Sequence, residues 1–125
     1  LAHANDQVIT DYLAHINVHD FAGRVKSRLI DLLPGGMFSE ADVAASLNVS
    51  LRTLQRRLAE EGTGFKVLLD EARRELAMRF IGERRLSIKE TSYLLGFSEP
   101  STFSRAFKRW TGVAPADYRD SARSQ

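Results

Sequence analysis

Two stretches of the sequence, Leu47-Asn48-Val49-Ser50 and Leu95-Gly96-Phe97-Ser98, decide the fold, because they repeat one pattern at an offset of 48 residues. In each stretch a leucine precedes a turn, and a serine then stands where a helix can begin. The repeat continues with a growing offset, as two small insertions would produce. The matching pairs are Leu54 with Phe103, Arg56 with Arg105 and Leu58 with Phe107 at 49 residues, then Gly62 with Gly112 and Phe65 with Pro115 at 50. A short helix, a tight turn and a capped second helix, present twice, is the layout of paired helix-turn-helix units.

Outward from the repeat, apolar residues recur at helical spacing, and no segment alternates convincingly as a strand. Phe65, Leu76 and Phe80 belong to an apolar stripe that predicts one helix of about 17 residues between the two units. The predicted fold is all-α, with about seven helices: two helix-turn-helix subdomains joined by this long linker helix, plus an N-terminal linker helix at residues 5–17. The expected divisions are residues 1–20 (linker from a missing domain), 21–62 (first subdomain), 63–82 (connecting helix) and 83–125 (second subdomain).

Capping residues mark where several of these helices begin. Ser39 and Ser87 each precede an acid by three residues, the arrangement of a capping box. Ser50 and Ser98 are expected to cap the second helix of each unit. Pro100 then falls in the first turn of its helix, where a missing N–H costs little.

Composition narrows the class of protein. Of the 125 residues, 43% are hydrophobic and 27% are charged, which suits one compact domain or two small ones. The chain contains no cysteine, which rules out disulfides, cysteine-ligated zinc and thiol catalysis. No apolar run approaches the length of a membrane span and no signal peptide is evident, so we expect a cytoplasmic location and no membrane partner. Since the first residue is Leu1 rather than Met, we expect the chain to be a fragment of a longer protein.

The net charge of +2 hides an asymmetry along the chain. Residues 1–20 contain three acids and no lysine or arginine, which leaves 18 basic and 13 acidic residues in the remainder. A mildly basic body permits nucleic-acid binding without establishing it.

The second helix of each unit combines an apolar face with a polar, basic face. The predicted buried faces are Leu51, Leu54 and Leu58 in the first helix and Phe103, Ala106, Phe107 and Trp110 in the second. The outward positions are Arg52, Thr53, Gln55 and Arg56 in the first helix, and Ser101, Thr102, Ser104, Arg105 and Lys108 in the second. Arginine can bond bidentately to guanine and glutamine to adenine, whereas lysine suits a phosphate. Such a face is usually only a solvated surface, but two of them at matching positions of a repeat favour DNA recognition.

The second unit resembles the C-terminal signature of the AraC/XylS family of bacterial transcription regulators. The matching residues are Leu94-Leu95-Gly96-Phe97-Ser98-Glu99, Phe103-Ser104-Arg105-Ala106-Phe107-Lys108, and Gly112-Val113-Ala114-Pro115 through Tyr118-Arg119. The first unit is similar to that family's first helix-turn-helix through Val43-Ala44, Val49-Ser50, Arg52-Thr53-Leu54-Gln55-Arg56-Arg57-Leu58 and Gly62. One departure is Thr91-Ser92, which stands where the family usually has Ile-Ala. Both residues are small, and their hydroxyls can bond back to the helix backbone.

This resemblance covers about residues 21–120 and implies seven helices, with two recognition helices in successive major grooves of double-stranded DNA. It also implies a separate N-terminal domain for a small-molecule effector or for dimerisation, and contact with RNA polymerase. It places base contacts at Arg52, Gln55 and Arg56. The whole predicted DNA-binding set is Ser50, Leu51, Arg52, Thr53, Gln55 and Arg56 in the first unit, with Ser98, Pro100, Ser101, Thr102, Ser104, Arg105 and Lys108 in the second.

Other groups of residues give weaker indications of a functional site. Asp11, His15 and His19 recur at helical spacing, but nothing supplies a convincing fourth metal ligand. We interpret Trp110 and Tyr118 as core residues. No Ser/His/acid set or close carboxylate pair stands out, so we expect a binding protein and not an enzyme, with no metal or cofactor. The run of charges Asp70, Glu71, Arg73, Arg74 and Glu75 is typical of surface charge pairing.

Three alternatives stay open at this point. The chain could be a helical protein-interaction module whose basic faces only keep it in solution, a repair enzyme that carries this binding module, or an architectural DNA binder without sequence preference. The absence of cysteine excludes alkyl transfer to a thiol within these residues. The outward Gln55 and the serine and threonine positions favour base recognition.

Overall fold

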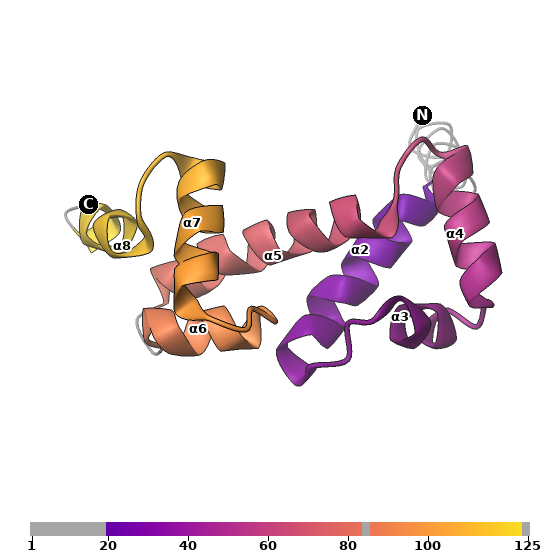
Figure 1. Ribbon diagram of the computed structural model, residues 1–125, viewed down its shortest axis with the longest axis horizontal. Coiled ribbons are helices and arrows are strands. Elements are labelled where there is room, and N and C mark those ends of the chain that lie inside the picture. Colours follow the sequence, from indigo (N-terminus) through magenta and orange to yellow (C-terminus); the bar gives the residue numbers. More distant parts are fainter. Residues whose placement is uncertain (1–19, 84–85, 124–125) are drawn as a thin grey trace, which may run out of the picture.

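The chain is a string of helices joined by short turns (Figure 1) in the computed structural model, which describes residues 20–83 and 86–123. The elements are α2 (Phe21–Leu32), the 3₁₀ helix η1 (Leu33–Gly35), α3 (Glu40–Ser46), α4 (Leu51–Glu60), α5 (Phe65–Gly82), α6 (Ile88–Leu94), α7 (Pro100–Thr111) and α8 (Pro115–Arg123). These ranges hold seven α-helices and no strand, which confirms the all-α prediction. None of the helices described is long and apolar enough to cross a membrane. The helix predicted at residues 5–17 and the cluster of Asp11, His15 and His19 lie outside the described residues.

The first helix-turn-helix unit consists of α3 and α4, which pack against α2 (Figure 1). Its core is formed by the buried side chains of Phe21, Val25, Leu29, Val43, Leu54 and Leu58. The carboxylate of Glu61, directly after α4, accepts hydrogen bonds from the backbone N–H groups of Phe21 (3.0 Å) and Ala22 (3.1 Å). These N–H groups have no partner within α2, so a distant acid completes the start of this helix.

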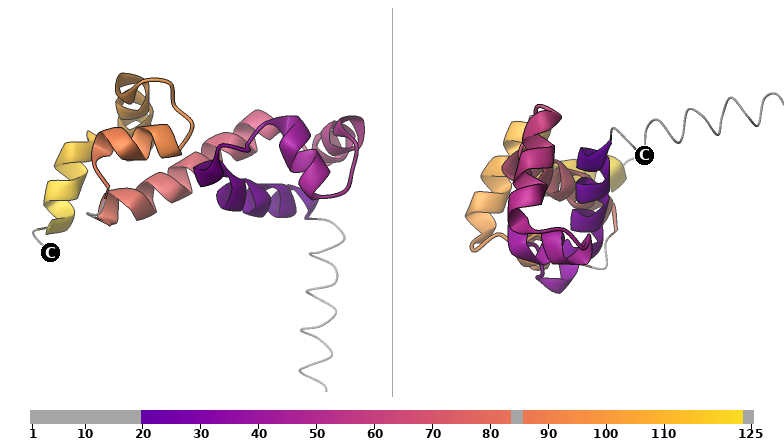
Figure 2. Two further views of the ribbon diagram at one scale, coloured as in Figure 1. Left: turned by 90° about the horizontal axis from the view of Figure 1, so that it is seen from below. Right: turned by 90° about the vertical axis from the view of Figure 1, so that its right-hand side faces the viewer.

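The long helix α5 connects the two units and contacts α2 in the first and α6, α7 and α8 in the second (Figures 1 and 2). Its buried side chains belong to one continuous core with those of both units. They are Leu68, Ala72, Leu76, Ala77 and Ile81. Because α5 is packed along its length on both units, it can hold them at a fixed separation.

The second unit has an aromatic core under α7. Phe103 lies between Phe97 and Phe107, with ring centroids 5.5 Å and 5.8 Å away, and Phe107 meets Tyr118 of α8 edge-on at 5.5 Å. Tilted and edge-on pairs at these distances are favourable beyond the apolar area that they bury. Tyr118 and Trp110 are half-buried against this core, which confirms their interpretation as core residues.

Arg73 of α5 joins the two units, and the prediction that it belongs to a surface charge network is wrong. Its Nε and Nη2 donate to the backbone carbonyls of Leu95 (2.8 Å) and Gly96 (3.3 Å) at the end of α6. Its guanidinium lies over the rings of Phe38, 5.5 Å from the centroid, and Phe97, 4.7 Å from the centroid. Burial lowers the pKa of this guanidinium, and the nearby carboxylate of Asp70 opposes that shift. The prediction is wrong because the partners of Arg73 lie 22 and 23 residues away in the sequence. Helical spacing indicates only pairs that are three or four residues apart.

The turn between α6 and α7 needs glycine. Gly96 has φ +84°, and a Cβ there would lie 2.6 Å from Cζ of Phe38. The matching turn in the first unit is made by Asn48, with φ 59°. Asparagine tolerates this left-handed conformation better than most residues, and it suffices where space is open to a side chain.

The starts of the helices follow the predicted caps with two corrections. Ser87 and Glu90 form a complete capping box, and the backbone bond from Ser87 holds the pKa of the Glu90 carboxyl below its usual range. Ser39 caps α3 by accepting from the N–H of Asp42 at 3.0 Å, but only this half of the expected box is formed. Ser98 does not cap α7, which begins one residue later, after Glu99. The reason is Pro100, because a residue before proline is kept out of the helical conformation.

Thr91 and Ser92 are both fully buried in α6. Their hydroxyls donate to the carbonyls of Ser87 (2.9 Å) and Lys89 (2.7 Å), so the expected bonds to the helix backbone are confirmed. Both hydroxyls therefore have a hydrogen-bond partner although they are buried.

We expect Arg73→Met to lower the free energy of unfolding by about 1.5–3 kcal/mol, because charged hydrogen bonds to two carbonyls are lost. The matched control is Arg74→Met, which removes an exposed arginine from the next position of the same helix and should stay within about 0.5 kcal/mol. Urea denaturation followed by circular dichroism measures both variants. Equal losses in the two variants would contradict the role of Arg73.

Candidate nucleic-acid interface

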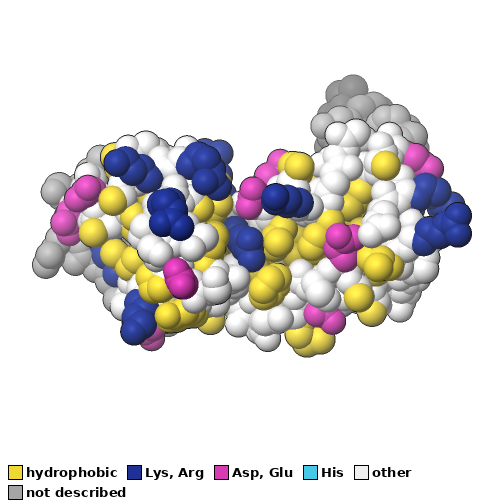
Figure 3. Space-filling model, viewed as in Figure 1, with side chains coloured by type: hydrophobic (Ala, Val, Ile, Leu, Met, Phe, Trp, Pro, Cys, Tyr) yellow, Lys and Arg dark blue, Asp and Glu magenta, His cyan; other side chains and the backbone are white. Residues whose placement is uncertain are grey.

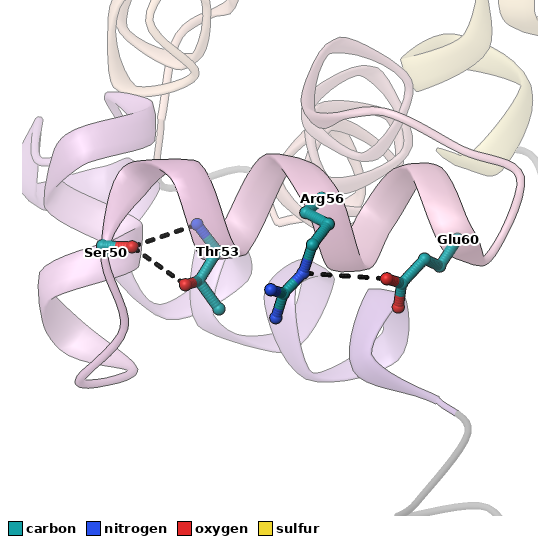
Figure 4. A network of polar contacts seen from close by, with 4 residues as sticks. All are labelled: Ser50, Thr53, Arg56 and Glu60. Atoms are coloured by element: carbon teal, nitrogen blue, oxygen red, sulfur yellow. Dashed lines mark hydrogen bonds and ion pairs between the residues drawn. The ribbon is translucent and has the colours of Figure 1, made fainter.

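Helix α4 starts at a well-formed cap that presents its first turn outward (Figure 4). The Ser50 hydroxyl accepts a hydrogen bond from the N–H of Thr53 at 3.0 Å and donates to the Thr53 hydroxyl at 2.9 Å. One turn further, Arg56 projects on the same side as Thr53, and its Nε lies 3.7 Å from Oε1 of Glu60. This ion pair is exposed, so it contributes little stability and leaves Arg56 able to change partners.

Opposite this surface, Leu54 and Leu58 are fully buried. Leu51 was predicted to share their face, but it is 42% exposed. It is the first residue of α4 and lies one turn before Leu54, the first buried residue of this helix. An exposed leucine at the start of a recognition helix offers an apolar contact of the kind that thymine methyl groups accept.

The side chain of Gln55 is exposed, and it has a defined hydrogen-bond partner. Its amide Nε2 donates to Oε2 of Glu40 at 2.9 Å. Glu40 is the first residue of α3, so this bond ties the outward surface of α4 to the preceding helix of the unit.

Helix α7 presents a corresponding surface in the second unit. Phe103, Ala106 and Phe107 are buried, while Arg105 and Lys108 are exposed on the other side. Near its start, the Ser101 hydroxyl lies 3.5 Å from Oε2 of Glu99, a long hydrogen bond.

None of the thirteen residues predicted to contact DNA is buried. The half-buried ones are Thr53, Pro100, Thr102 and Ser104, and the exposed ones are Ser50, Leu51, Arg52, Gln55, Arg56, Ser98, Ser101, Arg105 and Lys108. The acids that engage some of them, Glu40, Glu60 and Glu99, were not predicted. Glu60 could have been found from its four-residue spacing to Arg56, whereas Glu40 is fifteen residues from Gln55 and no local pattern indicates it.

The structure brings these residues together as two surfaces, one on each unit. Helices α4 and α7 lie at opposite ends of α5, and their axes run in similar directions in the views of Figures 1 and 2. Lysine and arginine side chains gather over the α7 end and at the opposite edge beside α4, as Figure 3 shows. Two outward, partly basic helices joined by one packed connecting helix are suited to two neighbouring segments of a polyanion. This arrangement defines a nucleic-acid-binding protein with paired helix-turn-helix units.

Comparison with known proteins gives the family. A family model described as a helix-turn-helix domain matches residues 43–121. An HTH-type transcriptional regulator of Mycobacterium tuberculosis is 53% identical over 77 residues, which cover 62% of this chain and 22% of that protein. The chain belongs to the AraC-type helix-turn-helix family, and curated relatives that it matches are named as HTH-type transcriptional regulators.

Solved structures share the fold. The crystal structure of the DNA-binding domain of AdpA, a global transcriptional factor in complex with a target DNA, has a TM-score of 0.64 and 27% identity over 82% of this chain and 93% of that chain. ToxT of Vibrio cholerae, with an unsaturated fatty acid bound, has a TM-score of 0.57 and 25% identity over 74% of this chain and 34% of that chain. This chain spans about a fifth of the length of the curated mycobacterial relatives that it matches at 53% identity.

We expect Arg52→Ala, Gln55→Ala and Arg56→Ala each to weaken binding to a selected DNA site by about 1–3 kcal/mol, the scale of a good base contact. Far-UV circular dichroism should be unchanged, because all three side chains are exposed. Arg28→Ala, which removes one exposed charge from α2, is the control for net charge. Loss of helical signal in all three variants would assign these residues to structure instead.

Proposed function

We propose that this chain is the DNA-binding part of a bacterial transcription regulator, and that α4 and α7 enter successive major grooves on one face of the duplex. The observation that carries this proposal is the pair of exposed, partly basic helices held at the two ends of α5. Successive major grooves lie about 34 Å apart. Because the two helices differ in sequence, one chain recognises an asymmetric site of roughly 15–20 base pairs.

The proposed division of labour follows position along each helix. In the first unit Arg52, Gln55 and Arg56 contact base edges, and Leu51 and Thr53 line the same surface. In the second unit Arg105 contacts a base edge and Lys108 a phosphate, since Lys108 lies nearer the helix end, where a recognition helix leaves the groove floor. The remaining members of the predicted set are proposed to contact the sugar-phosphate backbone or flanking bases. They are Ser50, Ser98, Pro100, Ser101, Thr102 and Ser104.

The proposed subdomains are residues 21–62 and 83–125, joined by the connecting segment 63–82, with residues 1–20 as a linker. In the full-length regulator a further N-terminal domain would bind a small-molecule effector, and the regulator would contact RNA polymerase in the cytoplasm. ToxT, of which the matched region covers 34%, has an unsaturated fatty acid bound, and this supports a small-molecule effector for the full-length regulator.

Two other functions remain to be tested against this one. A protein-interaction module would show no retention on mixed-sequence DNA at low salt. An architectural binder would bind operator and scrambled DNA equally. Gln55 is an exposed amide between the exposed arginines Arg52 and Arg56 of α4. It favours sequence recognition, because an amide adds hydrogen-bonding specificity without adding charge.

The assignment of Arg105 and Lys108 predicts different salt and sequence effects. A phosphate contact releases counterions whatever the sequence, so Lys108→Ala should weaken binding to operator and scrambled DNA about equally and lower the salt slope by about one unit. Arg105→Ala should mainly reduce discrimination at one or two adjacent base pairs. Titrations of both variants at several salt concentrations measure the two effects. The assignment is wrong if Lys108→Ala narrows the gap between operator and scrambled DNA more than Arg105→Ala does.

A further inference from the structure

The hydrogen bond between Gln55 and Glu40 gives the recognition surface of the first unit a defined chemical orientation. Nε2 of Gln55 lies 2.9 Å from Oε2 of Glu40. An ionised carboxylate only accepts hydrogen bonds, so it can pair with the amide nitrogen but not with the amide oxygen. The bond therefore determines which end of the Gln55 amide faces α3 and which end faces away.

This orientation suits one base more than the others. An amide nitrogen carries two N–H donors, and the bond to Glu40 uses one of them. The second N–H and the amide oxygen together match N7 and the N6 amino group of adenine in the major groove. Guanine offers two acceptors at the same edge, which an amide held in this orientation cannot satisfy with its oxygen.

The repeat shows that Glu40 is not needed to build a helix-turn-helix unit. Helices α3 and α6 match at an offset of 48, so the counterpart of Glu40 is Ile88, the first residue of α6. The counterpart of Gln55 at the offset of 49 is Ser104. Both members of the pair are thus specific to the first unit, although both units fold in the same way.

We propose that Glu40 is a specificity-determining positioning residue that orients the Gln55 amide for adenine before DNA is bound. The proposal rests on the proposed function, in which Gln55 contacts a base. Without the acid, an exposed glutamine samples several rotamers and both amide orientations, and this freedom is lost only on binding. Glu40 itself need not touch DNA to exert this effect.

The test uses the whole chain and a site recovered by selection from random DNA. Gln55→Ala first identifies the base pair that Gln55 recognises, as the position where discrimination falls. Glu40→Gln then keeps the size of the side chain but accepts either end of the Gln55 amide. We expect it to lower the preference for adenine at that base pair by about two- to tenfold, the scale of one hydrogen bond.

Two further variants control for charge and folding. Asp42→Asn removes one negative charge from the same first turn of α3 and leaves the Gln55 bond intact, so it should keep the adenine preference. It should raise affinity for scrambled DNA as much as Glu40→Gln does, because each variant removes one like charge from the neighbourhood of the phosphates. Glu40→Asp retains the charge and withdraws the carboxylate by one methylene, so it should reduce the preference without raising affinity for scrambled DNA.

The outcomes separate this inference from the function on which it rests. If Gln55→Ala leaves discrimination unchanged at every base pair, the proposed role of Gln55 in base recognition fails, and the role of Glu40 fails with it. If Gln55→Ala removes the adenine preference but Glu40→Gln and Glu40→Asp retain it in full, only the positioning role is wrong. An increased adenine preference in Glu40→Gln would also overturn the proposal, because Glu40 would then compete with DNA for the amide.

Discussion

The guanidinium of Arg73 is the contact on which the relation between the two helix-turn-helix units depends. It extends from the connecting helix, donates to two carbonyls at the end of α6, and lies over Phe38 near the first unit and Phe97 in the second. Those carbonyls have no partner within α6, and the end of a helix attracts positive charge. Since α7 begins four residues after Gly96, this contact from the connecting helix adds to the core packing that positions α7.

The same physical device recurs at two other helix ends. Glu61 completes the start of α2 from the end of α4. Arg119 of α8 donates to the carbonyl of Ile81 (3.1 Å) in the last turn of α5, and to that of Leu86 (2.8 Å), four residues after this helix ends. In each case a charge of the sign that the helix end attracts comes from a distant part of the chain. These hydrogen bonds fix the orientation of the helices that they join, whereas the apolar packing of the core is non-directional. A fixed spacing between α4 and α7 is consistent with such bonds.

Local signals in the sequence were sufficient for the helices and for the two units. Periodic apolar residues marked the buried faces, and the Ser87 capping box marked the start of α6, because these features involve neighbours three or four residues apart. The repeat pairs Ser98 with Ser50 and therefore predicts Ser98 as the cap of α7, whereas Pro100 makes the helix begin one residue later, after Glu99. Arg73 and Glu40 were missed for a different reason. Their partners lie 22 and 15 residues away, so only the packing of helices reveals them.

In the proposed function, one chain recognises an asymmetric site through two different helices in successive major grooves. The most direct measurement is selection of bound sequences from a random pool of double-stranded DNA by this chain. We expect an enriched site with two unlike sequence elements whose centres lie about 10 base pairs apart, one helical turn of the duplex. Recovery of a single element, of two identical elements in a palindrome, or of no enriched sequence at all would contradict it.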